Sequence, residues 1–185
     1  MKRINRVYLI RHGQINGYED FPVYGHTDVD LTEIGILQMQ QMSERLRLAD
    51  LEAIYSSDLK RSTTGARIIA RYHDVPVYFL LSDIQGHFPE ELEKRKADLV
   101  NYRIPGDAES IGHFSKRVTD CYERILAGHE GKDIVIVAHG GVNRVILCKA
   151  LGLDLVHLFN IHQAYGCLNI IDYFSDSVLV RLING

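Results

Sequence analysis

Two stretches of the sequence place a histidine and a glycine directly after an apolar run. In "VYLIRHGQ", Val7–Gln14, four apolar or aromatic residues precede Arg11 and His12. In "IVIVAHGGVNR", Ile134–Arg144, the apolar run precedes His139 and two glycines. Short apolar runs of this kind are typical of buried strands, and glycines are typical of the points where such elements end. The repeated arrangement therefore indicates one site built at the ends of two strands.

The residue types around these two junctions suit a compact dianion. The guanidinium of Arg11 is a planar fork of donors that matches phosphate or carboxylate oxygens. Arg61 follows the apolar segment "IYSS" in the first turn of a predicted helix, from which it can reach the same rim. Gly13 and Gly140 allow backbone N–H groups to approach a ligand closely. Two arginines, two histidines and backbone donors together indicate a pocket for a phosphoryl group.

The two histidines can have different roles in phosphoryl transfer. One attacks phosphorus and carries a covalent phosphoryl group, since histidine is an established nucleophile. Its ordinary pKa near 6.5 leaves the ring neutral, as a nucleophile must be, at physiological pH. The other histidine holds a phosphoryl oxygen as charge accumulates, together with the arginines. A carboxylic acid is expected to protonate the leaving alkoxide. This chemistry requires neither a metal ion nor an organic cofactor.

Rival classes of site lack their signatures. No two histidines have the four-residue spacing of a His-Glu-x-x-His zinc site. No Gly-x-Gly-x-x-Gly follows the first apolar run, and no Gly-Lys-Ser/Thr phosphate loop is present. An isolated Arg-His pair is more often a solvated turn than a site. The phosphoryl interpretation therefore depends on the two junctions occurring together.

The bulk composition is that of an ordinary globular protein. The chain has 185 residues, of which 46% are hydrophobic and 24% charged, and we expect a single domain over residues 1–185. The formal net charge of -3 does not indicate a nucleic-acid binder. The apolar runs are shorter than the roughly 20 residues that span a bilayer, so we expect a cytoplasmic protein without a membrane partner. Three cysteines without a Cys-x-x-Cys spacing indicate neither a disulfide framework nor a zinc site.

The elements that must position these residues alternate along the chain. Apolar runs predict strands, and three- and four-residue spacing predicts helices. The predicted strands are 7–10, 53–57, 76–81, 134–138 and two within 167–183, and the predicted helices begin at about residues 32, 58, 89, 110 and 140. This alternation predicts an α/β three-layer sandwich, a mostly parallel sheet with helices on both faces and an antiparallel edge. Ligands of such sheets bind beyond the carboxyl ends of the strands, where both junctions lie.

Four blocks of the sequence, in order, resemble the signatures of the histidine phosphatase superfamily, which has the phosphoglycerate-mutase-like fold. "LIRHGQ" resembles its Arg-His-Gly signature, and "GHTDVDLTEIG" resembles its Gly-x-Thr-Asp-x-x-Leu-Thr-x-x-Gly block. "IYSSDLKRSTTGARIIA" and "IVIVAHGGVNRVIL" resemble the segments that carry the second arginine and the second histidine. The blocks reach from the N-terminus to about residue 152. Their joint occurrence is a far more specific signal than any one of them.

The resemblance implies a role for each residue of the predicted site. It implies that His12 is the nucleophile that becomes phosphorylated. It also implies that the phosphate pocket is completed by Arg11, Arg61, His139, the side chain of Ser57 and the backbone of Gly140.

The general acid is the residue at which the chain departs most from the family. The family's proton donor lies in a Leu-x-Glu-Ile pattern after the third apolar run, and "LSDI" at that place makes Asp83 the candidate. A neutral Asp83 needs a pKa raised from about 3.9, which burial beside a phosphate can supply. Glu109 resembles another residue at the pocket and is the second candidate. The tryptophan-containing loop that usually follows the acid is missing, and Tyr18 stands where many members have an asparagine that lines the pocket.

The chain length favours hydrolysis over transfer, because the mutases of the family carry an inserted segment that encloses the reaction. The length and the "QAYGCLNIIDY" ending resemble the alpha-ribazole phosphatases of cobalamin assembly and their broad-specificity relatives. We therefore expect metal-independent hydrolysis of a small-molecule phosphomonoester, with alpha-ribazole 5'-phosphate as the candidate, by a monomer or homodimer. The alternatives are a phosphoglycerate mutase-type phosphotransferase, a protein phosphohistidine phosphatase and, from another class, a phosphate-binding module without turnover.

Overall fold

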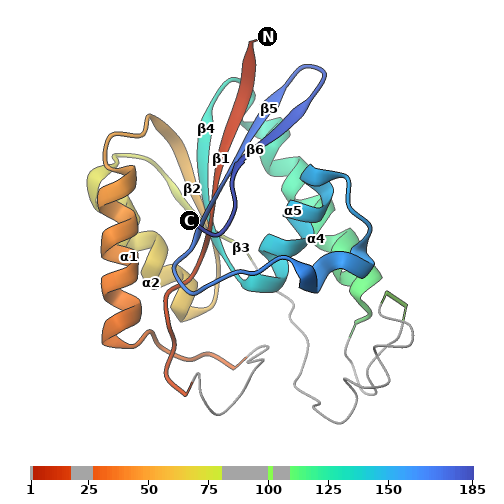
Figure 1. Ribbon diagram of the computed structural model, residues 1–185. Coiled ribbons are helices and arrows are strands. Elements are labelled where there is room, and N and C mark those ends of the chain that lie inside the picture. The colour runs from red at the N-terminus through yellow and green to blue at the C-terminus, as the bar shows by residue number, and fades with distance from the viewer. Residues whose placement is uncertain (1, 18–26, 81–99, 102–108) are drawn as a thin grey trace.

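A computed structural model describes residues 2–17, 27–80, 100–101 and 109–185 of the chain. Over these residues the centre of the molecule is a sheet of six strands in the order β3-β2-β4-β1-β5-β6 (Figure 1). In chain order the elements are β1 (Arg3–Arg11), α1 (Glu33–Leu46), β2 (Leu51–Ser57), α2 (Lys60–Ile69), η1 (Ala70–Tyr72), β3 (Val77–Leu80), α4 (Ile111–Gly128), β4 (Asp133–Ala138), α5 (Gly140–Leu151), η3 (Leu155–Asn160), β5 (Leu168–Phe174) and β6 (Val178–Leu182).

The sheet is parallel on one side and antiparallel on the other. Strand β4 pairs in parallel with both β1 and β2, and β2 pairs in parallel with β3. Strand β5 runs antiparallel to β1, and β6 runs antiparallel to β5. The α/β fold with an antiparallel edge is thus confirmed. Strand β1 begins before its apolar run because Arg6 lies opposite Asp172 of β5, and its Nε donates to that carboxylate at 2.6 Å.

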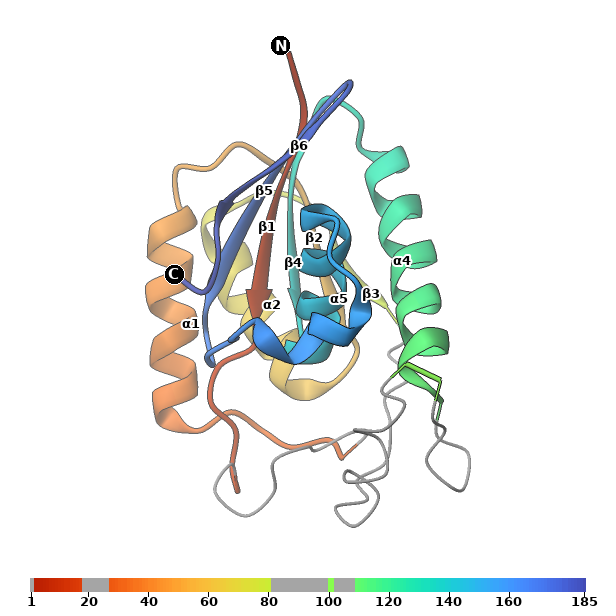
Figure 2. The same cartoon turned by 45° about the vertical axis from the view of Figure 1, so that its right-hand side comes forward.

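Helices cover both faces of the sheet, as the alternating pattern predicts. Helices α1 and α2 lie against one face, and α4 and α5 lie against the other (Figures 1 and 2). Along β4, Ile134 and Ile136 pack with α4 and α5, whereas Val135 and Val137 pack with α1 and α2. Alternate side chains of a strand point to opposite faces, so a strand covered on both sides needs an unbroken apolar run. This explains why "IVIVA" carries no polar residue.

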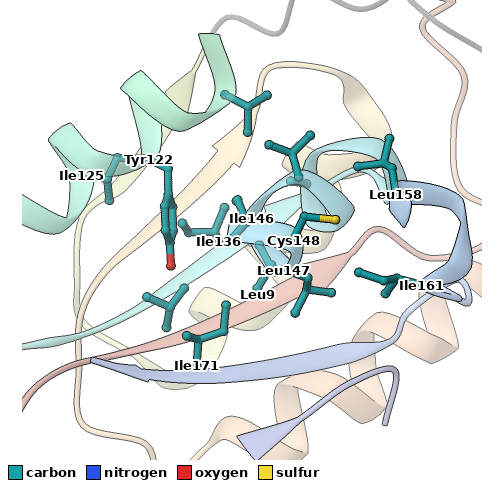
Figure 3. Close-up of a cluster of buried hydrophobic side chains, with 14 of the residues drawn as sticks. Leu9, Tyr122, Ile125, Ile136, Ile146, Leu147, Cys148, Leu158, Ile161 and Ile171 are labelled. Atoms are coloured by element: carbon teal, nitrogen blue, oxygen red, sulfur yellow. The ribbon is translucent and has the colours of Figure 1, made fainter. Parts of the chain in front are cut away.

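Helix α4 buries a tyrosine against the sheet. Tyr122 is 2% exposed and belongs to the buried cluster between the sheet and α5 (Figure 3). Its neighbour Cys121, which falls on the apolar spacing of the helix, is half-buried and packs against the same cluster. The hydroxyl of Tyr122 lies 2.8 Å from the hydroxyl of Tyr173 on β5. A buried tyrosine needs such a partner for its polar tip. That partner lies 51 residues away in sequence, so the helical pattern could not reveal it.

The start of α1 is packed directly against the backbone that follows β1. Thr32 caps the helix, as the sequence predicts, by accepting from the backbone N–H of Gly35 at 2.9 Å. A Cβ added at Gly35 would lie 2.1 Å from the carbonyl oxygen of Gln14, and one added at Gly13 would lie 2.3 Å from the carbonyl oxygen of Gly35. No side chain fits at such distances. The two glycines therefore allow α1 to hold the turn that follows His12.

Some predicted features lie outside the described residues. These are Tyr18, the segment that contains Asp83 and the helix predicted from Pro89. Among the residues that the structure describes, no helix combines the length and the apolar composition needed to cross a bilayer.

Candidate active site

Parallel pairing brings three strand ends to one edge of the sheet. Strand β1 ends at Arg11, β2 at Ser57 and β4 at Ala138. The backbone N–H of His12 donates to the carbonyl of Ala138 at 3.0 Å, so the pairing of β1 with β4 continues past the strand. As a result the rings of His12 and His139 lie edge to face, with their centroids 5.2 Å apart.

The ring of His12 is held in an orientation that suits a nucleophile. The residue is 4% exposed, and its Nδ1 lies 2.8 Å from the carbonyl oxygen of Gly13. A carbonyl oxygen can only accept a hydrogen bond, so Nδ1 carries the proton of the neutral ring. The other nitrogen, Nε2, then keeps the lone pair with which an imidazole attacks phosphorus.

The second histidine stands at the start of a helix. His139 is the residue before α5, whose first residue is Gly140. Its Nε2 lies 2.7 Å from Oγ of Ser57, the last residue of β2. The amino end of a helix carries partial positive charge and unpaired backbone donors, which favour an anion. A phosphoryl oxygen can therefore take the place of the serine hydroxyl on His139.

Two arginines bring full positive charge to the same edge. Arg61, in the first turn of α2, is 3% exposed, and its Nη1 donates to the carbonyl of Thr27 at 2.7 Å. Arg11 is held by the carbonyl of Gln163, which accepts from Nη1 at 2.5 Å. The Nε of Arg11 is buried and has no hydrogen-bond partner within the described part of the chain. Burial lowers the pKa of both guanidinium groups, because each cation is largely removed from water. A dianion bound at this edge of the sheet would stabilise both positive charges.

The same burial keeps both histidines neutral. Burial and the positive charge of Arg61 and Arg11 lower the pKa of His139 to about 3. Burial, followed by the neighbouring His139 and the positive charge of Arg11, holds the pKa of His12 well below 6.5. A neutral His12 is ready for attack at physiological pH. A phosphate dianion would reverse the electrostatic part of both shifts, because an adjacent negative charge favours the protonated ring.

The buried His139 predicts a measurable dependence of stability on pH. Its folded pKa of about 3 lies below the unfolded value of about 6.5, so at pH 5.5 only the unfolded chain binds a proton there. Stability therefore falls as the pH drops below about 6.5, and one such group contributes a loss of about 1.4 kcal/mol at pH 5.5. We expect the unfolding free energy of the wild type to fall by about this amount more than that of His139→Gln between pH 7.5 and 5.5.

Urea unfolding of the two proteins in phosphate-free buffer measures this difference. Groups that titrate in both proteins cancel in the comparison. Equal pH dependence in the two proteins would mean that His139 is protonated in the folded state, and would contradict the electrostatic description of the pocket.

The structure brings together most of the residues that the sequence proposes for the site. Around the strand ends lie Arg11, His12, Ser57, Arg61, His139 and Gly140. Glu109 lies just before α4 and is ion-paired with Arg117 of that helix. Its place at the pocket stays a prediction, as does that of Asp83, which lies outside the described residues. Within the described ranges, no group of three or more His, Cys, Asp or Glu side chains is placed to hold a metal ion.

Two contacts of the site were not predicted from the sequence. These are the carbonyl of Thr27, which holds Arg61, and the carbonyl of Gln163, which holds Arg11. Both act through the backbone, which every residue has, so the side-chain types gave no signal. The one signal in the sequence is that Gln163 opens the stretch "QAYGCLNIIDY", which ends in β5.

Comparison with known proteins identifies the family pattern over nearly the whole chain. The family model described as "Histidine phosphatase superfamily (branch 1)" matches residues 7–81 and 79–185. The chain is 29% identical to the metal-independent phosphoserine phosphatase of Arabidopsis thaliana, over 79% of this chain and 68% of that protein. It is 24% identical to the adenosylcobalamin/alpha-ribazole phosphatase of Salmonella typhimurium, over 97% of this chain and 96% of that protein.

The fold has a close counterpart among solved structures. The crystal structure of a putative alpha-ribazole-5'-P phosphatase from Escherichia coli superposes with a TM-score of 0.86 at 24% identity, covering 98% of this chain and 97% of the other. At this identity the likeness concerns the fold.

Proposed function

Since the chain belongs to branch 1 of the histidine phosphatase superfamily and is a phosphomonoesterase of that family, we propose that it works through a covalent phosphoryl group on His12, without a metal ion. The observation that carries this proposal is the contact of Nδ1 with the carbonyl of Gly13, 2.8 Å away, which leaves Nε2 free to attack. The surrounding arginines and His139 supply positive charge and hydrogen-bond donors for the phosphoryl oxygens.

The proposed reaction has two displacement steps at phosphorus. In the first, the lone pair of His12 Nε2 forms a P–N bond while the P–O bond of the ester breaks. The leaving alkoxide takes a proton from a carboxylic acid, for which Asp83 is the first candidate and Glu109 the second. In the second step the carboxylate takes a proton from a water molecule, the water oxygen attacks phosphorus, the P–N bond breaks, and inorganic phosphate leaves, so the carboxylic acid and the neutral His12 are both regenerated. The Nδ1–H of His12 keeps its bond to the carbonyl of Gly13 throughout, which stabilises the positive charge of the phosphorylated ring.

Two substrates follow from the relatives, and we propose alpha-ribazole 5'-phosphate as the first. The similarity to the Salmonella alpha-ribazole phosphatase extends over 97% of this chain and 96% of that protein. Phosphoserine is the second candidate, because the Arabidopsis phosphoserine phosphatase has the higher identity, 29%, although over 68% of its own length. Both are small phosphomonoesters, and they differ in the size and charge of the leaving group.

Hydrolysis of p-nitrophenyl phosphate in excess chelator tests the class of reaction. We expect turnover to survive chelation and to release inorganic phosphate, even when an alcohol acceptor is added. Parallel assays with alpha-ribazole 5'-phosphate and phosphoserine then rank the two substrates by kcat/KM. Loss of turnover in chelator would contradict the metal-independent mechanism. Phosphate binding without any turnover would support a binding module in place of an enzyme.

A further inference from the structure

The segment Gln163–Cys167, which we call the backing segment, holds Arg11 and His12 from the side of β5. The backbone N–H of Arg11 donates to the carbonyl of Cys167 at 3.1 Å, and the N–H of Gly166 donates to the carbonyl of His12 at 3.0 Å. The guanidinium Nη1 of Arg11 donates to the carbonyl of Gln163 at 2.5 Å. Three hydrogen bonds thus fix the backbone and one end of the Arg11 side chain.

The backing segment also places an aromatic ring against the same guanidinium. The Cζ atom of Arg11 lies 3.8 Å from the centroid of the Tyr165 ring, so the cation sits over the ring face. The ring of Tyr165 is also 5.7 Å from the ring of His12, centroid to centroid. Tyr165 is therefore in contact with both residues of the Arg-His pair.

Buried amide groups make the backing segment rigid. Gln163 is 1% exposed, and its Oε1 accepts from Nδ2 of Asn143 at 3.1 Å and from Nδ2 of Asn169 at 2.9 Å. Its Nε2 donates to Oδ1 of Asn169 at 2.8 Å, and Asn169 in turn donates to the carbonyl of Leu9 at 3.0 Å. These bonds tie the segment to α5, β5 and β1. Because the backing segment is held in this way, the carbonyl of Gln163 and the ring of Tyr165 can keep Arg11 in one orientation.

The nature of these partners matters, because both are uncharged. Within the described ranges, no carboxylate forms an ion pair with Arg11. A carboxylate would orient the guanidinium, but it would also neutralise the charge that a phosphoryl group has to meet and would repel that group. A backbone carbonyl and an aromatic face orient the cation without cancelling its charge. Arg11 is therefore held in a fixed orientation while its positive charge stays available to bind a dianion.

We propose that Tyr165 is a positioning residue for Arg11, and that its ring face sets the plane in which the guanidinium meets the phosphoryl oxygens. The proposal rests on the proposed function, since it assumes that Arg11 binds the phosphoryl group. The hydroxyl of Tyr165 also raises the pKa of Arg11, so removing the hydroxyl alone should have a small effect, and replacing the whole ring by an aliphatic side chain should have a larger one. A misaligned bidentate donor loses one of its two hydrogen bonds to the anion.

The comparison of Tyr165→Leu with Tyr165→Phe separates the ring from the hydroxyl. We expect Tyr165→Leu to lower kcat/KM for p-nitrophenyl phosphate by about tenfold, and to weaken the binding of inorganic phosphate by a similar factor. We expect Tyr165→Phe to lose less than about threefold in both. Tyr72→Leu, at a tyrosine that is 51% exposed on η1, is the matched control and should change neither value by more than about twofold.

The same change in an Arg11→Met background shows whether the effect passes through Arg11. If Tyr165 positions Arg11, Tyr165→Leu should have less than about a twofold further effect once that cation is gone. An equal tenfold loss in both backgrounds would overturn the proposal, as would a Tyr165→Phe variant as weak as Tyr165→Leu. Calorimetry measures the affinity for inorganic phosphate without turnover, so it tests the role of Tyr165 separately from the proposed phosphatase function. A wild type without turnover refutes the proposed function, while its phosphate affinity still tests Tyr165.

Discussion

Replacing His12 by alanine is expected to lower kcat for p-nitrophenyl phosphate by at least about 10⁴-fold. The proposed reaction needs a nucleophile at the position of Nε2, and no described side chain other than His139 places an imidazole nearby. His139 has a different neighbour on its Nε2, the hydroxyl of Ser57 at 2.7 Å. The arginines remain in the variant and still bind phosphate, so the loss should appear in kcat far more than in phosphate affinity.

Steady-state hydrolysis with a circular dichroism check on folding measures this effect. His157→Ala is the control, because His157 is an exposed histidine on η3 and should change kcat by no more than about twofold. A His12→Ala protein that is folded and keeps more than about a hundredth of the wild-type kcat would exclude His12 as the nucleophile.

Replacing Arg61 by methionine is expected to lower kcat/KM by about 10²- to 10³-fold. The guanidinium is almost fully buried and is aimed by the carbonyl of Thr27, so its charge acts on the pocket with little screening from water. Methionine keeps much of the packing and removes the charge. Arg61→Lys restores a charge without the planar fork, and we expect its kcat/KM to fall between the wild type and Arg61→Met.

Arg67→Met on the same helix is the matched control. Arg67 is exposed on α2 and lies over the ring of Phe79, with 5.5 Å between Cζ and the ring centroid. Its loss should leave kcat/KM within about twofold. Equal effects of the two changes would mean that the general positive charge of α2, and not the placement of Arg61, promotes the reaction.

The part of the site that the sequence predicts is the part set by strand ends. His12 and His139 each follow an apolar run, and parallel strands bring their carboxyl ends to one edge, so their proximity follows from the pattern. The cap at Thr32 is likewise local, because its partner is three residues away. Contacts of this kind depend on spacing alone, and spacing is visible in a sequence.

The contacts that the sequence could not predict join residues that are far apart in the chain, often through backbone groups that every residue type has. The carbonyl of Gln163 holds Arg11 across 152 residues, and any residue type could have supplied it. Tyr122 is buried in α4, where a second tyrosine on β5, 51 residues away in sequence, meets its hydroxyl. The ion pair of Glu109 with Arg117 could not be predicted either, because it depends on the conformation of the residues just before α4.

The most direct test of a covalent intermediate on His12 is to trap the phosphorylated enzyme. The protein is mixed rapidly with substrate and quenched in alkali, in which phosphohistidine survives, and its peptides are examined by mass spectrometry. We expect a phosphoryl group on the peptide that begins at His12 after cleavage at Arg11, and none on that peptide from His12→Ala. Turnover with no phosphoryl group on His12, or with the group on another residue, would exclude His12 as the nucleophile.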